Sequence, residues 1–193
     1  ILYRLSIFKE ITEERNCAVA CALGGALLAT GLISAGAVCG EGGGLISAVI
    51  FFALGQISLA VFSYLYMRTL PFNVHDELKS GNVAAGLSFG GALVALGLII
   101  MSSASGPQGG DALPGPDNPL AANSVNWAAE LISFGLANAA AFVFLPVLRW
   151  IGDRLIVPGR PLSLEIKEDR NIGAGLIQAT ALICFGALLA VLI

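Results

Sequence analysis

The chain has 193 residues, of which 56% are hydrophobic and only 12% are charged, and its mean hydropathy is +0.85. A soluble domain usually carries about 25% charged residues, so this composition argues against a soluble protein and indicates one embedded in the lipid bilayer. No basic patch with interleaved aromatic residues is present in the sequence, which argues against nucleic acid as a partner.

Five apolar stretches are each long enough to cross about 30 Å of hydrocarbon as a helix that rises about 1.5 Å per residue. They cover residues 16–38, 45–68, 82–103, 123–150 and 171–193. The Gly/Pro/Asp-rich stretch 104–122 predicts a loop, residues 152–170 predict a charged connector, and Pro146 predicts a kink in the fourth helix. The expected fold class is therefore an all-α membrane protein, with five transmembrane helices in a single membrane domain over residues 1–193.

The distribution of charge predicts the orientation. All ten Lys and Arg residues flank one end of the predicted helices, whereas the opposite loops carry Glu41, Asp111 and Asp117 and no basic residue. The positive-inside rule then places the basic loops in the cytoplasm and the C-terminus outside. Residues 1–4 resemble the end of a helix whose beginning is missing, so six helices are expected in the complete protein.

An acidic motif that ends in Asn precedes the first, third and fifth apolar stretches. It reads EITEERN at residues 10–16, DELKSGN at 76–82 and EIKEDRN at 165–171. Each copy belongs to a unit of two helices joined by this charged elbow, and an even number of spans keeps all units in the same orientation. The sequence therefore predicts three parallel two-helix repeats, with the first helix of repeat 1 mostly missing, over residues 1–44, 45–122 and 123–193.

Small residues recur four, eight and fifteen positions after each Asn, close to one helix face. These helix-packing positions are Ala20, Gly24 and Gly31, then Gly86, Gly90 and Gly97, then Gly175, Ala179 and Gly186. Such faces let helices approach closely in lipid. We expect a pseudo-threefold arrangement in which the three helices line the centre through these faces, and contact of the faces with other subunits is the alternative.

The acidic elbow, its Asn and the Gly/Ala-rich helix that follows resemble a bacterial membrane family, and residues 77–86 show the resemblance best. The family is the one catalogued as domain of unknown function 350, the YjfL-like inner-membrane proteins. Repeats 1 and 3 depart from its pattern with Arg15 and Arg170 where Gly81 stands. The resemblance covers most of the chain and implies a bacterial inner-membrane location and tandem two-helix units, but it implies no activity.

The elbows supply the first candidate site. Asn16, Asn82 and Asn171 stand where helix N-caps belong, and acidic residues before them suit the positive end of a helix. The functional alternative is a ring of three amides at the cytoplasmic mouth of a central path, with an acidic elbow that attracts cations, made of Glu10, Asp76 and Glu165.

Amide side chains within the predicted helices supply the second candidate site. Gln56 and Asn138 fall close to the bilayer midplane, and Gln178 is a third candidate in the last helix. Buried amides need hydrogen bonds, so they mark either interhelical contacts or a polar path. Glu130, the only acid inside a predicted span, either snorkels to the outer interface or has a functional role.

Groups that bind metals or carry out catalysis are sparse. The four cysteines form no CxxC pair, and His75 is the only histidine, so no metal site, disulfide framework or cofactor is expected and an enzyme is disfavoured. The sequence favours a channel-like or transporter-like bundle with a polar path. The alternative is a structural or accessory subunit of a larger membrane complex, in which the chain forms a homo-oligomer or associates with other proteins.

Overall fold

A computed structural model describes residues 7–40, 44–106, 127–155 and 159–192, and every regular element in these ranges is helical. Five of the helices are long and apolar enough to span a membrane. They are α1 (Cys17–Cys39), α2 (Gly44–Thr69), α4 (Val83–Ala104), α5 (Trp127–Leu155) and α7 (Ile172–Leu192). The expected all-helical fold with five candidate spans is thereby confirmed.

Three short helices occupy the elbows: a π-helix η1 (Lys9–Glu13), α3 (Val74–Lys79) and α6 (Leu162–Lys167). The sequence patterns did not predict them as helices. The long helices begin and end within about two residues of the predicted limits, except α5, which continues through Pro146 to Leu155. The predicted loop beyond residue 106, the predicted start of the fourth helix at residue 123 and residues 1–4 lie outside the described residues.

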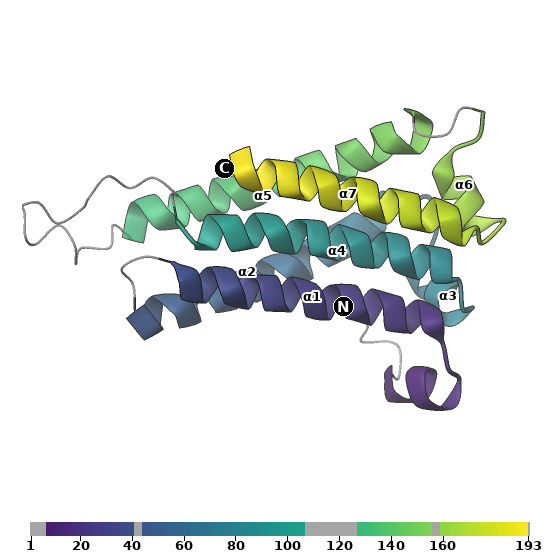
Figure 1. Cartoon of the computed structure of the whole chain (residues 1–193), viewed down its shortest axis with the longest axis horizontal. Helices are drawn as coiled ribbons and strands as arrows, with labels where there is room; N and C mark the ends of the chain where they lie inside the picture. Colours follow the sequence, from purple (N-terminus) through teal and green to yellow (C-terminus); the bar gives the residue numbers. More distant parts are fainter. Residues whose placement is uncertain (1–6, 41–43, 107–126, 156–158, 193) are drawn as a thin grey trace, which may run out of the picture.

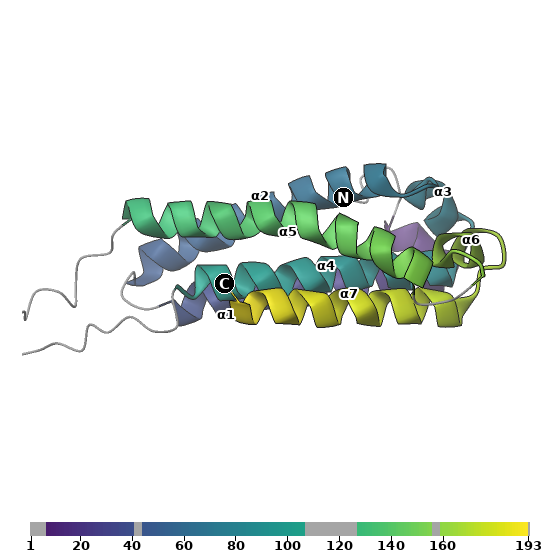
Figure 2. The ribbon, with the colours of Figure 1, turned by 90° about the horizontal axis from the view of Figure 1, so that it is seen from above.

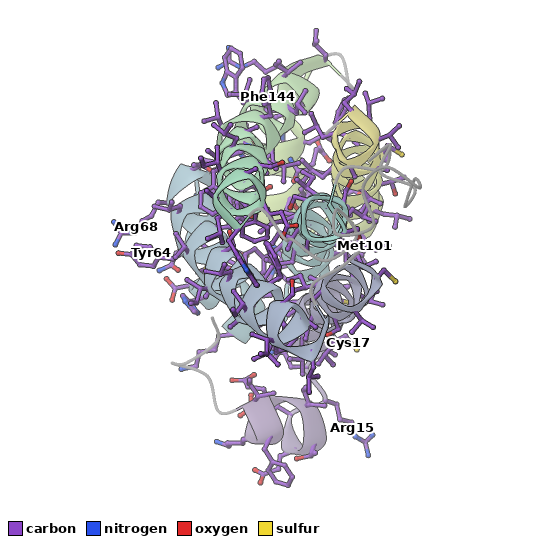
Figure 3. The ribbon with its side chains drawn as sticks, turned by 90° about the vertical axis from the view of Figure 1, so that its left-hand side faces the viewer. Arg15, Cys17, Tyr64, Arg68, Met101 and Phe144 are labelled. Atoms are coloured by element: carbon purple, nitrogen blue, oxygen red, sulfur yellow. The ribbon has the colours of Figure 1, made fainter. Side chains whose placement is uncertain are left out.

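The long helices form two layers (Figures 1 and 2). Helices α1, α4 and α7 make up one layer, and α2 and α5 make up the other, as the view along the helices also shows (Figure 3). Helix α2 packs on α1 and α4, and α5 packs on α4 and α7. All three elbow helices lie at the end of the bundle where α1, α4 and α7 begin (Figure 1). A single face of the membrane would therefore hold the three acidic motifs.

The first layer is a row, and this differs from the expected threefold bundle. Helix α4 packs along its length against α1 on one side and α7 on the other, whereas α1 and α7 have no comparable contact. Helix α4 is consequently the most enclosed span. In its apolar 18-residue segment 78% of the residues are buried, compared with 33% in α1 and 28% in α7. The small-residue faces of α4 and α7 contact the preceding helix of this row, and they do not surround a common axis.

Candidate functional site: elbow joints and buried polar groups

Each elbow places its Asn as the cap of a long helix. The Asn16 Oδ1 atom accepts a hydrogen bond from the backbone N–H of Ala18 at 3.0 Å, and Asn82 and Asn171 accept from the third residue beyond them at 3.2 and 3.3 Å. An oxygen acceptor at this place satisfies one of the unpaired N–H groups that begin a helix. The side-chain oxygens thus have the structural role expected of a cap.

The side-chain nitrogens of the same residues link one elbow to the next. Asn16 Nδ2 donates to the backbone carbonyl of Leu78 in α3 at 2.8 Å. Asn82 Nδ2 donates to the backbone carbonyl of Ile166 in α6 at 2.7 Å. We call the contact of α1 with α3 and α4 the first joint, and the contact of α4 with α6 and α7 the second joint. The same amide-to-carbonyl bond therefore occurs once in each joint.

Each Asn amide also donates to a glutamate in its own elbow. Asn16 donates to Glu10 at 2.9 Å, and Asn171 donates to Glu165 at 3.3 Å. In the middle elbow the acceptor is Glu77 at 2.8 Å, and Asp76 is exposed. The assignment of Asp76 as the equivalent of Glu10 and Glu165 is therefore wrong, because the middle elbow has one residue fewer between its acid and its Asn.

The residue before each Asn adopts a left-handed backbone conformation. The φ angle is 51° at Arg15, 50° at Arg170 and 77° at Gly81. This conformation costs a non-glycine residue about 1–2 kcal/mol, so the two arginines are retained against a local penalty. The Arg170 guanidinium donates to the backbone carbonyl and the hydroxyl of Ser80 at 3.2 and 3.1 Å, which ties the third elbow to the second.

The helices of the two joints meet at small residues in equivalent positions. Gly86 lies against Ala18 in the first joint, and Gly175 lies against Ala84 in the second. Farther along, a Cβ atom on Gly97 would lie 2.8 Å from the Cα atom of Ala29, and one on Gly186 would lie 2.7 Å from the Cα atom of Ala95. Neither position admits a larger side chain without movement of the backbone.

The helix-packing positions of α1 have a different environment. Ala20 is exposed, and a Cβ atom on Gly24 or Gly31 would meet no other group within 4 Å. Six of the nine predicted packing residues thus lie inside joints, namely Gly86, Gly90, Gly97, Gly175, Ala179 and Gly186. The three on α1 face outward.

The amides within the spans bond separately to hydroxyl groups on other helices. Asn138 accepts from Ser58 at 2.6 Å, and Gln178 accepts from Ser88 at 2.5 Å. Gln56 accepts from Thr30 at 3.4 Å. The three amides thus connect α5 to α2, α7 to α4 and α2 to α1. The structure does not join them with the elbow asparagines into one polar path.

A polar group that sequence reasoning missed lies where α5 approaches the elbow end. Asp153 accepts from the backbone N–H and the hydroxyl of Ser163 at 2.5 and 2.8 Å, and both residues are buried. Arg149, one turn earlier, is 5% exposed and donates to the carbonyl of Thr69 at 3.5 Å. These bonds tie the end of α5 to α6 and to the end of α2. The sequence signal was a basic and an acidic residue four positions apart.

A small cavity lies beside Arg149 and Gln178. Its volume is about 10 Å³, which is room for about one water molecule. The Nε atom of Arg149 and the Nε2 atom of Gln178 are buried, and neither has a hydrogen-bond acceptor among the described residues. The two residues that carry these donors therefore line a space too small for an organic solute.

The third elbow carries an exposed ionic cluster around Arg160. Its guanidinium pairs with Glu165 at 3.2 Å, with Glu168 at 2.6 Å and with Asp169. Desolvation is the largest single effect and lowers the pKa of Arg160. The charges of Asp169 and Glu165, together with the hydrogen bonds to Asp169 and Glu168, outweigh it and raise the pKa above its ordinary value. Exposed pairs of this kind contribute little to stability.

The remaining singled-out residues show no clustering. The four cysteines are free thiols, and Cys17, Cys39 and Cys184 are exposed. Glu130 lies in the first turn of α5, and His75 lies in α3. Within the described ranges, no group of three or more His, Cys, Asp or Glu side chains is arranged to hold a metal ion.

Comparison with known proteins gives one match. A family model described as Domain of Unknown Function (DUF350) matches residues 40–193, which include both elbows α3 and α6. No curated protein and no solved structure matches the chain. The first elbow and α1 precede the matched region, although their Asn and Glu residues make the same contacts as those of the second elbow.

Proposed function

The chain belongs to the DUF350 family, and we propose that it acts as a structural subunit of a larger assembly in the bacterial inner membrane. One observation carries this proposal: the same joint is used twice along the chain, with the same amide-to-carbonyl bond and the same small-residue contacts. Close helix packing and interhelical hydrogen bonds are the interactions that hold membrane helices together, because lipid offers no hydrophobic driving force between them.

The proposed topology has the elbows in the cytoplasm and the C-terminus outside. Support comes from the positive-inside rule, because the described basic residues lie in the elbows or near the ends of α2 and α5, and the elbows share one end of the bundle (Figure 1). Three parallel two-helix repeats, the first with a helix before η1, fit the recurring joint. No catalytic role is part of the proposal.

The buried amides favour a structural role over a polar path. Within the spans, the amide oxygens of Gln56, Asn138 and Gln178 each accept a hydrogen bond from a hydroxyl group on a neighbouring helix. Such bonds contribute about 0.6 kcal/mol each in membrane proteins, so they position helices without contributing large stability.

Extraction of the full protein from its native membrane in a mild detergent tests the proposal. We expect a particle that contains several polypeptides, measured by mass photometry together with quantification of the co-purifying chains. A particle that contains one copy of this chain and no other polypeptide, in detergent and in native lipid nanodiscs alike, would contradict a subunit role.

A second candidate function is conduction of a small inorganic anion, and the donors at the Arg149 cavity favour it. Buried ionisable residues in membrane segments often mark ion pathways. Liposomes that contain the purified protein would then show chloride flux, and Arg149→Met would abolish the flux. Equal flux with protein-containing and empty liposomes would exclude this candidate.

A further inference from the structure

Helix α7 exposes the face that α1 uses to pack against α4 and that α4 uses to pack against α7. The positions two, six, nine, thirteen and seventeen residues after the cap Asn are buried in both α1 and α4. In α4, for example, Ala84, Gly91 and Ala95 pack against α7. The same five positions of α7 are all exposed, namely Gly173, Ile177, Thr180, Cys184 and Leu188. We call them the trailing face.

Helix α1 exposes the complementary face. The positions four, eight, eleven and fifteen residues after the Asn are buried in α4 and in α7. In α1 none of them is buried, and Leu27 is 64% exposed. A groove runs along this side of α1 and is lined by Gly24, Leu27 and Gly31 among others. With Ala20, these residues form what we call the leading face.

The elbows show the same asymmetry. Val74 and Leu78 of α3 are at most 2% exposed, and so are Leu162 and Ile166 of α6. Counted from the glutamate that binds the Asn, the equivalent residues of the first elbow are Ile7 and Ile11, and both are only half-buried. In α7, the Asn171 amide makes no bond to an elbow carbonyl among the described residues, although Asn16 and Asn82 both do.

We propose that the trailing face of one copy of this chain binds the leading face of a second copy, which forms a third joint between molecules. In it, the Asn171 amide of one copy donates to the Ile11 carbonyl of the next. This inference rests on the proposed role as an assembly subunit, and it names the partner as the chain itself.

Charge complementarity supports this occupant. In the second joint, Arg170 reaches back to Ser80, which stands two residues before the preceding Asn. The equivalent pair in the third joint is Arg15 of one copy and Asp169 of the other, an exposed carboxylate that also pairs with Arg160 of its own chain. Arg15 has no ion-pair partner in the part of the chain that the structure describes, and it points away from the bundle (Figure 3).

The geometry of the joint also suits a bilayer. Both internal joints relate parallel helices that begin at the same end, so repetition of the joint keeps every copy in the same membrane orientation (Figure 1). A head-to-tail interface of this kind closes into a ring or continues as a row. One position departs from the internal joints, because Thr180 stands where α1 and α4 have Gly25 and Gly91. Gly24 would lie opposite it.

Cysteine crosslinking in native membranes tests the proposal. In the internal joints, a Cβ atom on Gly97 would lie 3.1 Å from the Ala29 Cβ atom, and one on Gly186 would lie 2.8 Å from the Ala95 Cβ atom. The equivalent pair between copies is Gly31 and Cys184, so a disulfide, which needs about 3.5–4.5 Å between Cβ atoms, is within reach there. Two differently tagged chains are co-expressed with the other cysteines replaced by Ala. One chain carries only Cys184, and the other carries Gly31→Cys with Cys184→Ala.

We expect oxidation to give crosslinked dimers that contain both tags and none that contain one tag twice. A control chain with Gly135→Cys in place of Gly31→Cys should give no crosslink, because Gly135 is equally open but lies on α5. Same-tag dimers would show a twofold interface, and absence of crosslinks would show that lipid, another protein or a preceding segment covers the leading face. Either result overturns the inference, even if native extraction yields a multi-chain particle and the subunit role stands.

A matched pair of substitutions gives a second readout. Gly24→Leu should weaken association between fluorescently labelled copies in nanodiscs by about tenfold or more, because overpacking would separate the helices. Gly135→Leu should leave it unchanged. A Cβ atom at either position meets no other group within 4 Å, so circular dichroism should show the same helix content for both. Equal association of the two variants would contradict the third joint.

Discussion

Replacement of Asn82 by Ala should cost much more stability than replacement of Asn171 by Ala. Asn82 is fully buried, caps α4, and donates both to Glu77 and to the carbonyl of Ile166. Loss of the cap costs about 1 kcal/mol, loss of the bond to the carbonyl about 1 kcal/mol, and loss of the bond to the carboxylate about 1.5 kcal/mol or more. The expected destabilisation is therefore about 3–4 kcal/mol.

Asn171 has the same cap position but lacks the bond to a following elbow. It is exposed, and its bond to Glu165 is 3.3 Å long. Asn171→Ala should therefore cost about 1 kcal/mol, which is the value of the cap alone. Asn82→Asp separates the two contributions, because it keeps the capping oxygen, removes both N–H donors and places a second carboxylate beside Glu77.

Unfolding by SDS in dodecyl maltoside micelles, followed by far-UV circular dichroism, measures these differences. Dilution of the protein until it is monomeric removes any contribution from association. We expect the order wild type, Asn171→Ala and Asn82→Ala from most to least stable, and Asn82→Asp should also be less stable than Asn171→Ala. Losses in the two Ala variants that agree within about 0.5 kcal/mol, the usual error of such comparisons, would refute a stabilising role for the bond between elbows.

Three further changes test other parts of the structure. Gly97→Ala should destabilise the monomer by about 1–3 kcal/mol in the same assay, because its Cβ atom would lie 2.8 Å from the backbone of α1, whereas Gly31→Ala should not. Gln178→Leu combined with Ser88→Ala should change stability by less than about 1 kcal/mol, because both partners of one bond are removed together. Arg160 gains charge stabilisation from its acidic neighbours, and its raised folded-state pKa means that this contribution is complete below the ordinary pKa and lost only as pH rises through the raised one. The free energy of unfolding should therefore show no pH-dependent step from this group between about pH 6 and about pH 9. Added salt should weaken the cluster. A step in this pH range that is present in the wild type and absent in Arg160→Gln would contradict the assignment.

The number and limits of the long helices could be predicted from the sequence, because lipid requires long uninterrupted apolar stretches. The capping positions of Asn16, Asn82 and Asn171 could also be predicted, since a cap depends only on residues next to it in sequence. The charge distribution also predicts that the elbows lie at one end of the bundle. This prediction does not require knowledge of how the helices pack.

The order of the helices in the row could not be obtained from the same patterns. A small-residue face shows that a helix packs closely, but not whether it has one neighbour or two. A signal was present in the adjacent glycines Gly90 and Gly91, which point about 100° apart on a helix and contact α1 and α7 respectively. The buried charged residues Arg149 and Asp153 were missed, because their burial depends on a tertiary contact in which α6 brings Ser163 to Asp153.

The two open ends of the row carry a smaller energetic cost in a bilayer than they would in water. In a soluble repeat protein the terminal units need polar caps, because an unpaired apolar face meets water. The trailing face of α7 and the leading face of α1 meet lipid instead, so their exposure carries little hydrophobic penalty. The elbow lies outside the apolar spans, and there Phe8 is 74% exposed and Ile7 and Ile11 are only half-buried. Burial of apolar groups at the elbow, together with the Asn171 and Arg15 contacts, would therefore supply most of the driving force for a third joint, and the glycines would determine how closely the helices approach once it forms.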